Sequence, residues 1–460
     1  MDEGASIASL FRPALDEQLH RARRAAQDAV LGRESPPGTR ALPYAPDSTP
    51  PALGHFVGIE PESSLVSFHR ALGRLAKGED EDGKVRVVVY GASHTQADLY
   101  TGYLRAYLQS RFGDGGQGFV PLGRVNHWYR TLDTRANHHA LTVYHAARVP
   151  ERTPAPLGLF GAAFVGRGGA YGEISTAKTS QSTEFEVHYF AQPGGGSFDL
   201  QVDGTTLARV VTHTTSPGAA HYSFRTAPGE HRIRARLRGS DPVRLFGVVA
   251  ETATPGLVID TLGIGGARMS GNLRWDEVTW AAALRRRKPD LVLFAYGTNE
   301  AADTGFSLPR YESELRSTLA RLRRATPEVS CVLVSPFDLS DKNRARLLRV
   351  IDAQRRISQE FGCGFWNGYA FMGGERSIRR WASAKPPLAS PDYVHLTRLG
   401  YVYAGIAIGD ALMRAYDQAG SEKPETPQAP AETMDSSLAK GSPAASSPAA
   451  SSPAADASLP

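Results

Sequence analysis

A serine, an aspartate and a histidine in this chain lie in local patterns that could support nucleophilic catalysis. Ser93 follows a run of mostly β-branched residues, 85–89, and a glycine, Gly91, and a helical pattern comes after it. This order of strand, glycine turn, serine and helix places one hydroxyl at the carboxyl edge of a parallel sheet. Ligand-binding and catalytic sites of α/β folds lie at that edge. Taken alone, Ser93 also fits an ordinary helix N-cap. The sequence therefore makes Ser93 a candidate nucleophile whose role depends on the rest of the chain.

The candidate partners of this hydroxyl lie near the other end of the sequence. Asp392 and His395 are three residues apart, so one turn of the chain can bring a carboxylate and an imidazole to the same side. By themselves, Asp392 also fits a turn residue and His395 a surface ring. Both interpretations stay open at this point.

The elements that must position these residues alternate between short apolar strands and longer helices. Apolar runs predict strands over 85–89, 257–262, 290–296, 329–335 and 363–366, and helical spacing predicts helices over 61–77, 274–288, 308–325, 344–361 and 399–419, with a further helix directly after Ser93. Such alternation indicates βαβ units, a parallel sheet and helices on both of its faces. The predicted fold class is therefore α/β, a three-layer α/β/α sandwich with a parallel sheet.

Two further residues follow predicted strands directly. Gly266 comes after the strand over 257–262, and Asn299 comes after the strand over 290–296. Glycine and asparagine are also ordinary turn residues. Because the carboxyl ends of parallel strands meet at one edge, however, Ser93, Gly266 and Asn299 should come together there. With Asp392 and His395 they would supply a nucleophile, a base, an orienting carboxylate and two more hydrogen-bond donors.

The pattern of apolar and polar residues changes between about residues 125 and 256. Helical periodicity disappears, and short β-like runs separated by turn clusters occur at 141–144, 185–191, 198–202, 207–212, 221–226, 231–237 and 243–249. This pattern is typical of an antiparallel β-sandwich. The histidines in its first part lack a fixed ligand spacing and a nearby carboxylate cluster, so we expect surface histidines and no metal site.

These patterns divide the chain into five segments. Residues 1–60 are predicted to hold an amphipathic helix (6–31) and a Pro-rich arm, and 61–124 the first part of the α/β domain. Residues 125–256 are the inserted sandwich, and 257–419 the second part of the α/β domain. Residues 420–460 are rich in Ala, Ser and Pro and cannot bury enough surface to fold, so they are predicted to be a disordered tail.

Composition excludes some function classes. The 460 residues hold 52 Lys and Arg against 47 Asp and Glu, a net charge of +5 that is too dilute to indicate nucleic-acid binding. No window approaches the roughly 20 apolar residues of a transmembrane helix. The start, Met1-Asp-Glu-Gly4, lacks the basic and apolar parts of a secretory signal. Two cysteines, Cys331 and Cys363, lie in apolar strand-like runs, and we expect buried free thiols there.

Taken together, these motifs resemble the SGNH hydrolase superfamily, the GDSL-like esterases and lipases. Its four blocks are matched in order by Gly91-Ala-Ser-His94, Gly266, Gly297-Thr-Asn299 and Asp392-Tyr-Val-His395. Within the superfamily, the segments around these blocks resemble bacterial envelope enzymes that remove or transfer O-acetyl groups on peptidoglycan and other polysaccharides. Some of those enzymes carry an inserted β-sandwich that resembles a carbohydrate-binding module. The resemblance covers most of residues 61–416.

The resemblance implies a flavodoxin-like SGNH fold and a role for each site residue. His395 would take the proton of Ser93, Asp392 would hold the imidazole tautomer, and an oxyanion hole would be formed by the amides of Ser93 and Gly266 and the side chain of Asn299. It implies no metal and no organic cofactor. The first block usually has aspartate before the serine, and here that position is Ala92. Because the family aspartate supports the turn and takes no proton, we expect activity to survive its replacement.

Two alternatives remain open from the sequence. One is a carbohydrate-binding or scaffold protein whose hydrolase domain is inert, and the other is a lipase or thioesterase with the same Ser-His-Asp triad. The expected partner is an acetylated glycan or another small acyl ester. The envelope location that the resemblance suggests conflicts with the missing export signal. Either water or a sugar hydroxyl could accept the acyl group.

Overall fold

The computed structural model describes residues 56–148 and 155–421. The helix expected over 6–31, the Pro-rich arm up to residue 55 and nearly all of the expected tail lie outside these ranges. In the part that is described, every helix is too short or too polar to cross a membrane.

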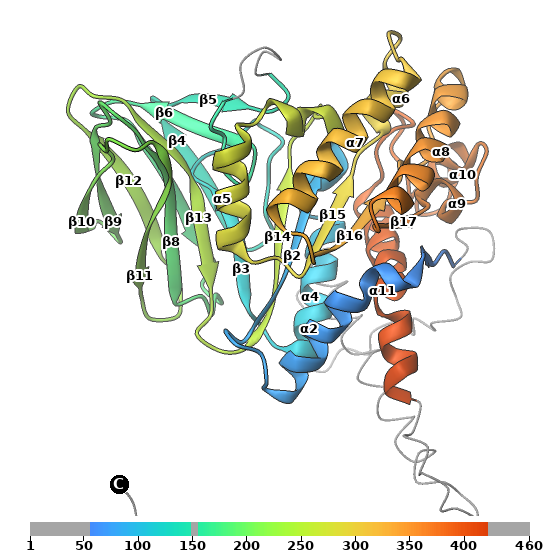
Figure 1. Cartoon of the computed structure of the whole chain (residues 1–460), viewed down its shortest axis with the longest axis horizontal. Helices are drawn as coiled ribbons and strands as arrows, with labels where there is room; N and C mark the ends of the chain where they lie inside the picture. The colour runs from blue at the N-terminus through green and yellow to red at the C-terminus, as the bar shows by residue number, and fades with distance from the viewer. Residues whose placement is uncertain (1–55, 149–154, 422–460) are drawn as a thin grey trace, which may run out of the picture. The chain divides into compact units, whose positions relative to one another are not determined.

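A six-stranded, mainly parallel sheet forms one half of the fold (Figure 1). Its strands, in spatial order, are β1 (Ile59–Glu60), β17 (Gly364–Trp366), β16 (Ser330–Val334), β15 (Leu291–Ala295), β2 (Lys84–Gly91) and β14 (Gly256–Gly263). All neighbours pair in parallel except β1, which runs antiparallel to β17 at the edge. The five strands predicted from apolar runs are the five parallel strands, and β1 is the addition that the sequence did not predict.

Helices cover both faces of this sheet. The long helices are α2 (Val66–Lys77), α4 (Tyr100–Phe112), α5 (Glu277–Arg287), α7 (Leu308–Ala325), α8 (Arg344–Glu360) and α11 (Arg398–Ser421). Alternate residues of β2 face opposite ways: Val85, Val87 and Val89 pack with α2, α4 and α11, whereas Val88 and Tyr90 pack with α5, α7 and α8. Because both faces are covered, the strands are buried throughout and need apolar side chains at successive positions.

Short helical turns connect these elements. They are α3 (Ser93–Gln96), α6 (Thr298–Ala302), α9 (Gly368–Phe371), α10 (Ser377–Ser383) and the 3-10 turns η1 (Glu62–Leu65), η2 (Met269–Arg274) and η3 (Asp341–Asn343). Two of them, α3 and α6, begin directly after parallel strands, where the site residues were expected.

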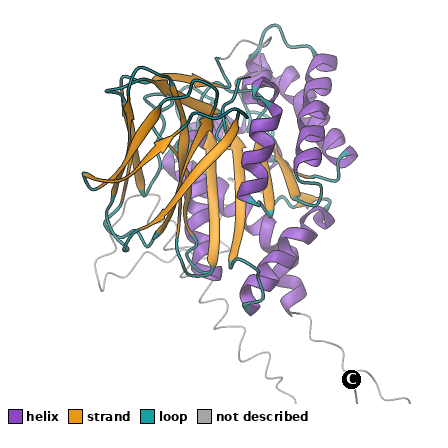
Figure 2. Cartoon of the chain, turned by 60° about the vertical axis from the view of Figure 1, so that its left-hand side comes forward, coloured by secondary structure: helices purple, strands orange, loops and turns teal. Residues whose placement is uncertain are grey.

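Two antiparallel sheets lie between β2 and β14 in the sequence. Figure 2 draws their strands, like those of the parallel sheet, in orange. One has the order β10 (Thr205–Val211), β9 (Ser197–Val202), β12 (Arg232–Arg238), β7 (Tyr171–Thr176) and β4 (Thr134–His139). The other has the order β11 (Gly218–Arg225), β8 (Glu184–Ala191), β13 (Val243–Glu251), β6 (Ala162–Gly166) and β5 (Thr142–His145), with β3 (Gly116–Pro121) also paired to β13. One continuous hydrophobic cluster fills this region and reaches one face of the parallel sheet, and both regions belong to a compact unit that ends at Asp417.

All seven short β-like runs found in the sequence overlap strands of these sheets. The unpredicted strands are β3, β4, β6 and β7. Their sequences explain this outcome, since β3 holds two glycines and β4 reads Thr-Arg-Ala-Asn-His-His. Strand propensity is weak for such residues, and pairing with neighbouring strands overrides it. The antiparallel pairing therefore begins at β3, ahead of residue 125.

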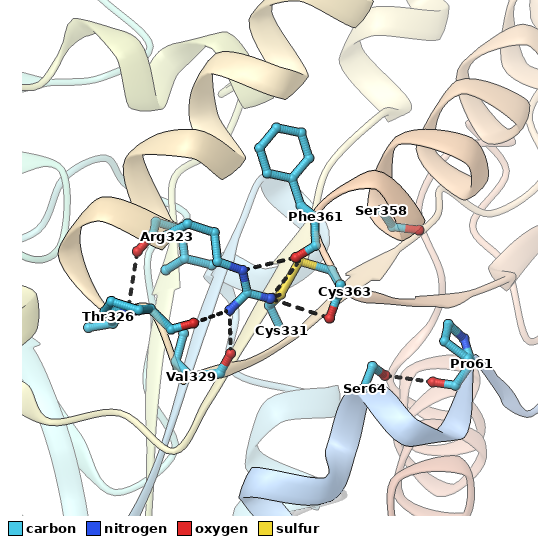
Figure 3. Close-up of a disulfide and its surroundings, with 12 residues drawn as sticks. Pro61, Ser64, Arg323, Thr326, Val329, Cys331, Ser358, Phe361 and Cys363 are labelled. Atoms are coloured by element: carbon cyan, nitrogen blue, oxygen red, sulfur yellow. Dashed lines mark hydrogen bonds between the residues drawn. A yellow bond between two sulfur atoms is a disulfide. The ribbon is translucent and has the colours of Figure 1, made fainter.

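The expectation that Cys331 and Cys363 are free thiols is wrong, because the two form a disulfide (Figure 3). Val332 of β16 pairs in parallel with Gly364 of β17, so the two cysteines are opposite each other with their Cα atoms 4.7 Å apart. That separation is within the range a disulfide spans. The Arg323 guanidinium lies against the bridge, 2.8 Å from the Cys331 sulfur. The pairing follows from strand register, which residue spacing alone does not give.

Candidate active site

Three adjacent parallel strands end at the same level. Gly263, the last residue of β14, pairs with Gly91 at the end of β2, and Gly91 also pairs with Ala295 at the end of β15. Ser93 and Asn299 therefore leave the same edge of the sheet, each within a few residues of a strand end. Gly266 follows β14 in the same way. The sequence-based expectation of a shared edge agrees with this register.

The structure brings Ser93, His395 and Asp392 into one hydrogen-bonded line. His395 Nε2 lies 2.9 Å from Ser93 Oγ, and His395 Nδ1 lies 2.7 Å from Asp392 Oδ2. If Nδ1–H donates to the carboxylate, Nε2 is left as the acceptor for the serine hydroxyl proton. The side chains of His395 and Asp392 are 40% and 49% exposed, so a substrate in solution can reach them. This geometry can activate a serine hydroxyl for attack on a carbonyl.

Asp392 is held as a carboxylate by its surroundings. Partial burial opposes its ionisation, but the hydrogen bond to the His395 ring outweighs that effect, together with two backbone amides. These are the amides of Val394 and His395, which donate to Asp392 Oδ1 at 2.9 and 3.0 Å. The pKa of Asp392 is consequently lowered from its ordinary value. The same two bonds fix the turn that presents the imidazole.

The turn before Ser93 is built by backbone contacts. A Cβ on Gly91 would come within 2.0 Å of the Thr95 hydroxyl oxygen and 3.2 Å of the Ala295 carbonyl oxygen, so only glycine fits there. The carbonyl of Ala92 accepts hydrogen bonds from the amides of Thr95 and Gln96, both at 3.1 Å. Ala92 is buried and has no side-chain cap to offer. The sharp strand-to-helix turn thus forms here without an acidic side chain at this position.

The three expected oxyanion donors lie on α3, on the glycine loop after β14 and on α6, and hydrogen bonds connect these three segments. Gly266 has a φ of +78° and is exposed, and among the described residues neither its amide nor that of Ser93 has a protein acceptor. Asn299 Nδ2 donates one proton to the carbonyl of Ala267 at 2.8 Å, which ties α6 to the glycine loop. A side-chain amide carries two donor protons, so the second remains free to reach another acceptor.

Gln96 is a connecting residue that sequence reasoning missed. Its Oε1 accepts hydrogen bonds from the Gly265 amide at 3.0 Å and from Asn126 Nδ2 at 3.2 Å. The last residue of α3 thereby holds both the glycine loop and the first loop after β3. Its position one helical turn after Ser93 was visible in the sequence. Its partners are far away along the chain, so no local signal pointed to them.

His94 is the second residue whose contacts the sequence did not give. It is buried, its Nδ1 lies 2.9 Å from the Tyr401 hydroxyl, and its ring centroid is 5.3 Å from that of His395. Burial, with a smaller contribution from nearby His395, lowers the pKa of His94 to about 3. His94 is therefore neutral at physiological pH and forms an uncharged wall beside the His395 ring.

A buried ion pair connects the segment after α3 with α4. Asp98 and Arg105 are linked by two hydrogen bonds of 2.9 and 3.0 Å, and Thr261 of β14 donates to Asp98 at 2.7 Å. Burial opposes ionisation of Asp98, but the charge of Arg105 and these hydrogen bonds together lower its pKa from the ordinary value. The pair fixes the segment that joins α3 to α4 against the adjacent strand.

No group of three or more His, Cys, Asp or Glu side chains in 56–148 and 155–421 is arranged to hold a metal ion. Of the histidines expected at the surface, His127 and His139 are exposed, but His145 is buried, so the expectation is wrong for that residue.

Comparison with known proteins gives a family match and a similar fold. Residues 231–403 match the model of the GDSL-like Lipase/Acylhydrolase family. This range contains Gly266, Asn299, Asp392 and His395, whereas Ser93 precedes it. Comparison with curated proteins gives no match.

Solved structures include one similar over most of the chain. A peptidoglycan O-acetylesterase aligns with a TM-score of 0.65 at 22% identity, covering 79% of this chain and 100% of its own. A carbohydrate esterase family 2 enzyme with a carbohydrate binding domain from Corynascus thermopiles (Myceliophthora fergusii) covers 60% of this chain and 100% of its own at 13% identity, with a TM-score of 0.28. A family two carbohydrate esterase from Cellvibrio japonicus covers 62% and 100% at 12% identity, with a TM-score of 0.26. The last two TM-scores are too low to bear on the fold.

The alignment with the peptidoglycan O-acetylesterase covers 79% of this chain, so the similarity in fold extends beyond residues 231–403. The resemblance predicted from the four sequence blocks is confirmed by the family match over residues 231–403 and by this shared fold, and the two findings together support a hydrolase of carboxylic esters.

Proposed function

We propose that this protein is a serine esterase that removes or transfers O-acetyl groups on a polysaccharide or peptidoglycan. The observation that carries the proposal is the line of hydrogen bonds from Asp392 through His395 to Ser93 at the carboxyl edge of a parallel sheet. The choice of an acetylated glycan rests on the resemblance of the sequence blocks and on the fold shared with a peptidoglycan O-acetylesterase.

The proposed reaction proceeds in two steps. Ser93 Oγ attacks the ester carbonyl carbon while its proton passes to His395 Nε2, and the tetrahedral intermediate expels the sugar alcohol, which takes that proton. Water then attacks the acetyl-serine, again giving a proton to His395, and acetate leaves as Ser93 regains its hydrogen. In a transferase a second sugar hydroxyl replaces water. Asp392 holds the imidazole tautomer and stabilises its charged form.

The amides of Ser93 and Gly266 and the side chain of Asn299 are the proposed oxyanion donors. Each such donor typically contributes about 2.7–4 kcal/mol to transition-state stabilisation. The exposed position of Gly266 and its positive φ are consistent with an amide that a substrate oxygen can reach.

The proposed architecture is the flavodoxin-like, three-layer SGNH fold with residues 125–256 as an inserted sandwich that resembles a carbohydrate-binding module. Helices on both faces of the parallel sheet and the position of the antiparallel sheets between β2 and β14 support it. We propose that 61–124 and 257–419 form the two parts of the hydrolase domain.

Acetate release is the experiment that tests this function. Wild-type protein should release acetate from O-acetylated peptidoglycan or from another acetylated polysaccharide, and it should hydrolyse p-nitrophenyl acetate faster than p-nitrophenyl octanoate. A preference for the octanoyl ester would favour the lipase or thioesterase alternative. Failure of a fluorophosphonate probe to label Ser93, together with no hydrolysis of any ester, would favour an inert glycan-binding protein.

Substitution of Asn299 by alanine should reduce kcat for p-nitrophenyl acetate by roughly 10²–10³-fold, because one oxyanion donor is lost. The measurement is steady-state kinetics, with the thermal unfolding midpoint recorded to show that loss of the bond to the Ala267 carbonyl leaves the fold intact. KM should change much less than kcat, since the donor acts mainly in the transition state. An unchanged kcat would mean that the amide points away from the reacting carbonyl.

A further inference from the structure

We propose that Trp128, with the adjacent ring of His127, forms a platform that binds a sugar ring of the substrate glycan close to the reactive serine. This inference deepens the proposed function and rests on it for the identity of the substrate. It assigns a binding role to a loop outside the four sequence blocks.

Trp128 differs from the other four tryptophans of the chain in its exposure. It is 60% exposed, whereas Trp275, Trp280, Trp366 and Trp381 are at most 4% exposed. Single exposed apolar residues are common on protein surfaces, so exposure alone does not indicate a site. The further evidence is the way in which the loop holds this indole and the place where it holds it.

The loop that carries Trp128 is fixed by its own hydrogen bonds. Asn126 Oδ1 accepts from the amides of Trp128 at 2.9 Å and Tyr129 at 3.0 Å, which closes a tight turn. Tyr129 is buried and packs its ring edge-on against Phe160 in the core. The indole is therefore presented to solvent from an anchored turn, and little conformational entropy is lost when a ligand stacks on it.

The same loop is bonded to the helix that begins with Ser93. Asn126 Nδ2 donates to Gln96 Oε1 at 3.2 Å, and the Arg130 amide donates to the Gln96 carbonyl at 3.3 Å. Since Gln96 lies one helical turn from Ser93 and Arg130 two residues from Trp128, the Cα of Trp128 is within roughly 20 Å of that of Ser93. A polymer with an acetyl group at the serine can span this distance with a few sugar units, whereas the acetyl group itself cannot.

The chemistry of the platform fits a sugar. The rings of His127 and Trp128 lie with centroids 4.7 Å apart and tilted by 45°, so a broad aromatic face stands beside a polar ring. The C–H groups of a pyranose can pack on the apolar face of the indole, and its hydroxyls can form hydrogen bonds with the imidazole. The exposed Arg124 donates to the His127 carbonyl and adds a positive charge at the edge, which suits a glycan that carries carboxylates.

The kinetic test compares Trp128→Ala with wild type on an O-acetylated glycan and on p-nitrophenyl acetate. We expect kcat/KM for the glycan to fall on the order of tenfold, mainly through KM, and by much more than for the small ester. Trp128→Phe should recover part of the loss. Leu207→Ala is the matched control, because Leu207 is 51% exposed on β10 and is outside the proposed site. Equal losses on both substrates, or no loss on the glycan, would overturn the proposal.

A binding measurement separates this inference from the proposed function. Soluble glycan strands released from O-acetylated peptidoglycan, and acetylated xylan in parallel, are titrated calorimetrically into Ser93→Ala and into Ser93→Ala/Trp128→Ala. Weaker binding by the double variant supports the platform even if wild type releases no acetate, in which case only the esterase function fails. Equal binding by both variants, or no binding of either glycan, overturns the platform whatever the esterase activity.

Discussion

Replacing Ser93 by alanine should lower kcat for p-nitrophenyl acetate by about 10⁴-fold or more, as expected when the nucleophile of an interdependent group is removed. His395 Nε2 would then have no hydroxyl to deprotonate, although it stays 2.7 Å from Asp392 through its other nitrogen. The measurement is steady-state hydrolysis, with labelling by a fluorophosphonate probe as a second readout. Both signals should disappear while the circular dichroism spectrum stays unchanged.

Two companion variants sharpen this test. His395→Ala should cost about as much as Ser93→Ala, and the double variant should be no worse than either, because residues that act as a unit give non-additive losses. Ser313→Ala, an exposed serine on α7, is the matched control and should retain full activity. Additive losses, or turnover by Ser93→Ala close to wild type, would remove the assignment of Ser93 as nucleophile.

Replacing Asp98 by alanine should lower the free energy of unfolding by about 3–5 kcal/mol, because it leaves Arg105 charged and buried without its partner. Arg105 would keep its contacts with the Thr261 hydroxyl and the Ile259 carbonyl, which are neutral and cannot replace a carboxylate. Urea denaturation followed by tryptophan fluorescence measures the change. Because Asp98 holds the segment between α3 and α4, esterase activity should also become more sensitive to temperature.

The control for this prediction is an exposed pair of the same type. Asp352 and Arg356 form a 3.2 Å ion pair on α8 in which the Asp352 side chain is 69% exposed, and Asp352→Ala should cost no more than about 1 kcal/mol. The double variant Asp98→Ala/Arg105→Met should recover part of the lost stability, since no buried charge then remains. A loss for Asp98→Ala no larger than that for Asp352→Ala would contradict the structure.

The contribution of Asp98 to the free energy of unfolding should decrease as the pH falls. Burial opposes its ionisation, but Arg105 and the hydrogen bonds outweigh burial, so its pKa in the folded chain is below the value of about 3.9 in the unfolded chain. The folded state therefore binds fewer protons than the unfolded state, and the contribution is fully present above about pH 4. The stability difference between wild type and Asp98→Ala should shrink as the pH falls below that value.

Much of this site was predictable because its residues follow strand ends. Apolar runs located β2, β14 and β15, and parallel pairing then required Ser93, Gly266 and Asn299 to share an edge. The link from His395 to Ser93 was a prediction from residue order and family resemblance, and the 2.9 Å contact agrees with it. The catalytic roles of these residues stay predictions until the variants are measured.

The features that sequence reasoning missed depend on partners far along the chain. Gln96 contacts Gly265, and His94 contacts Tyr401, through bonds that only the assembled fold creates. The Cys331–Cys363 bridge needs the register of β16 and β17, which spacing does not encode. Polar or glycine-rich strands such as β3 and β4 form because neighbouring strands supply hydrogen bonds, in spite of weak local preference.

The pairing of β2 with β14 determines when β2 can join the parallel sheet during synthesis of the chain. The two strands are neighbours in the parallel sheet, yet residues 92–255 separate them along the sequence. The other neighbour of β2 is β15, which comes later still in the sequence, so neither edge of β2 can pair with its partner strand until the antiparallel sheets have been translated. Since unpaired hydrophobic edges promote aggregation in slow, non-local topologies, a defect in the inserted strands should reduce the yield of folded protein as a whole.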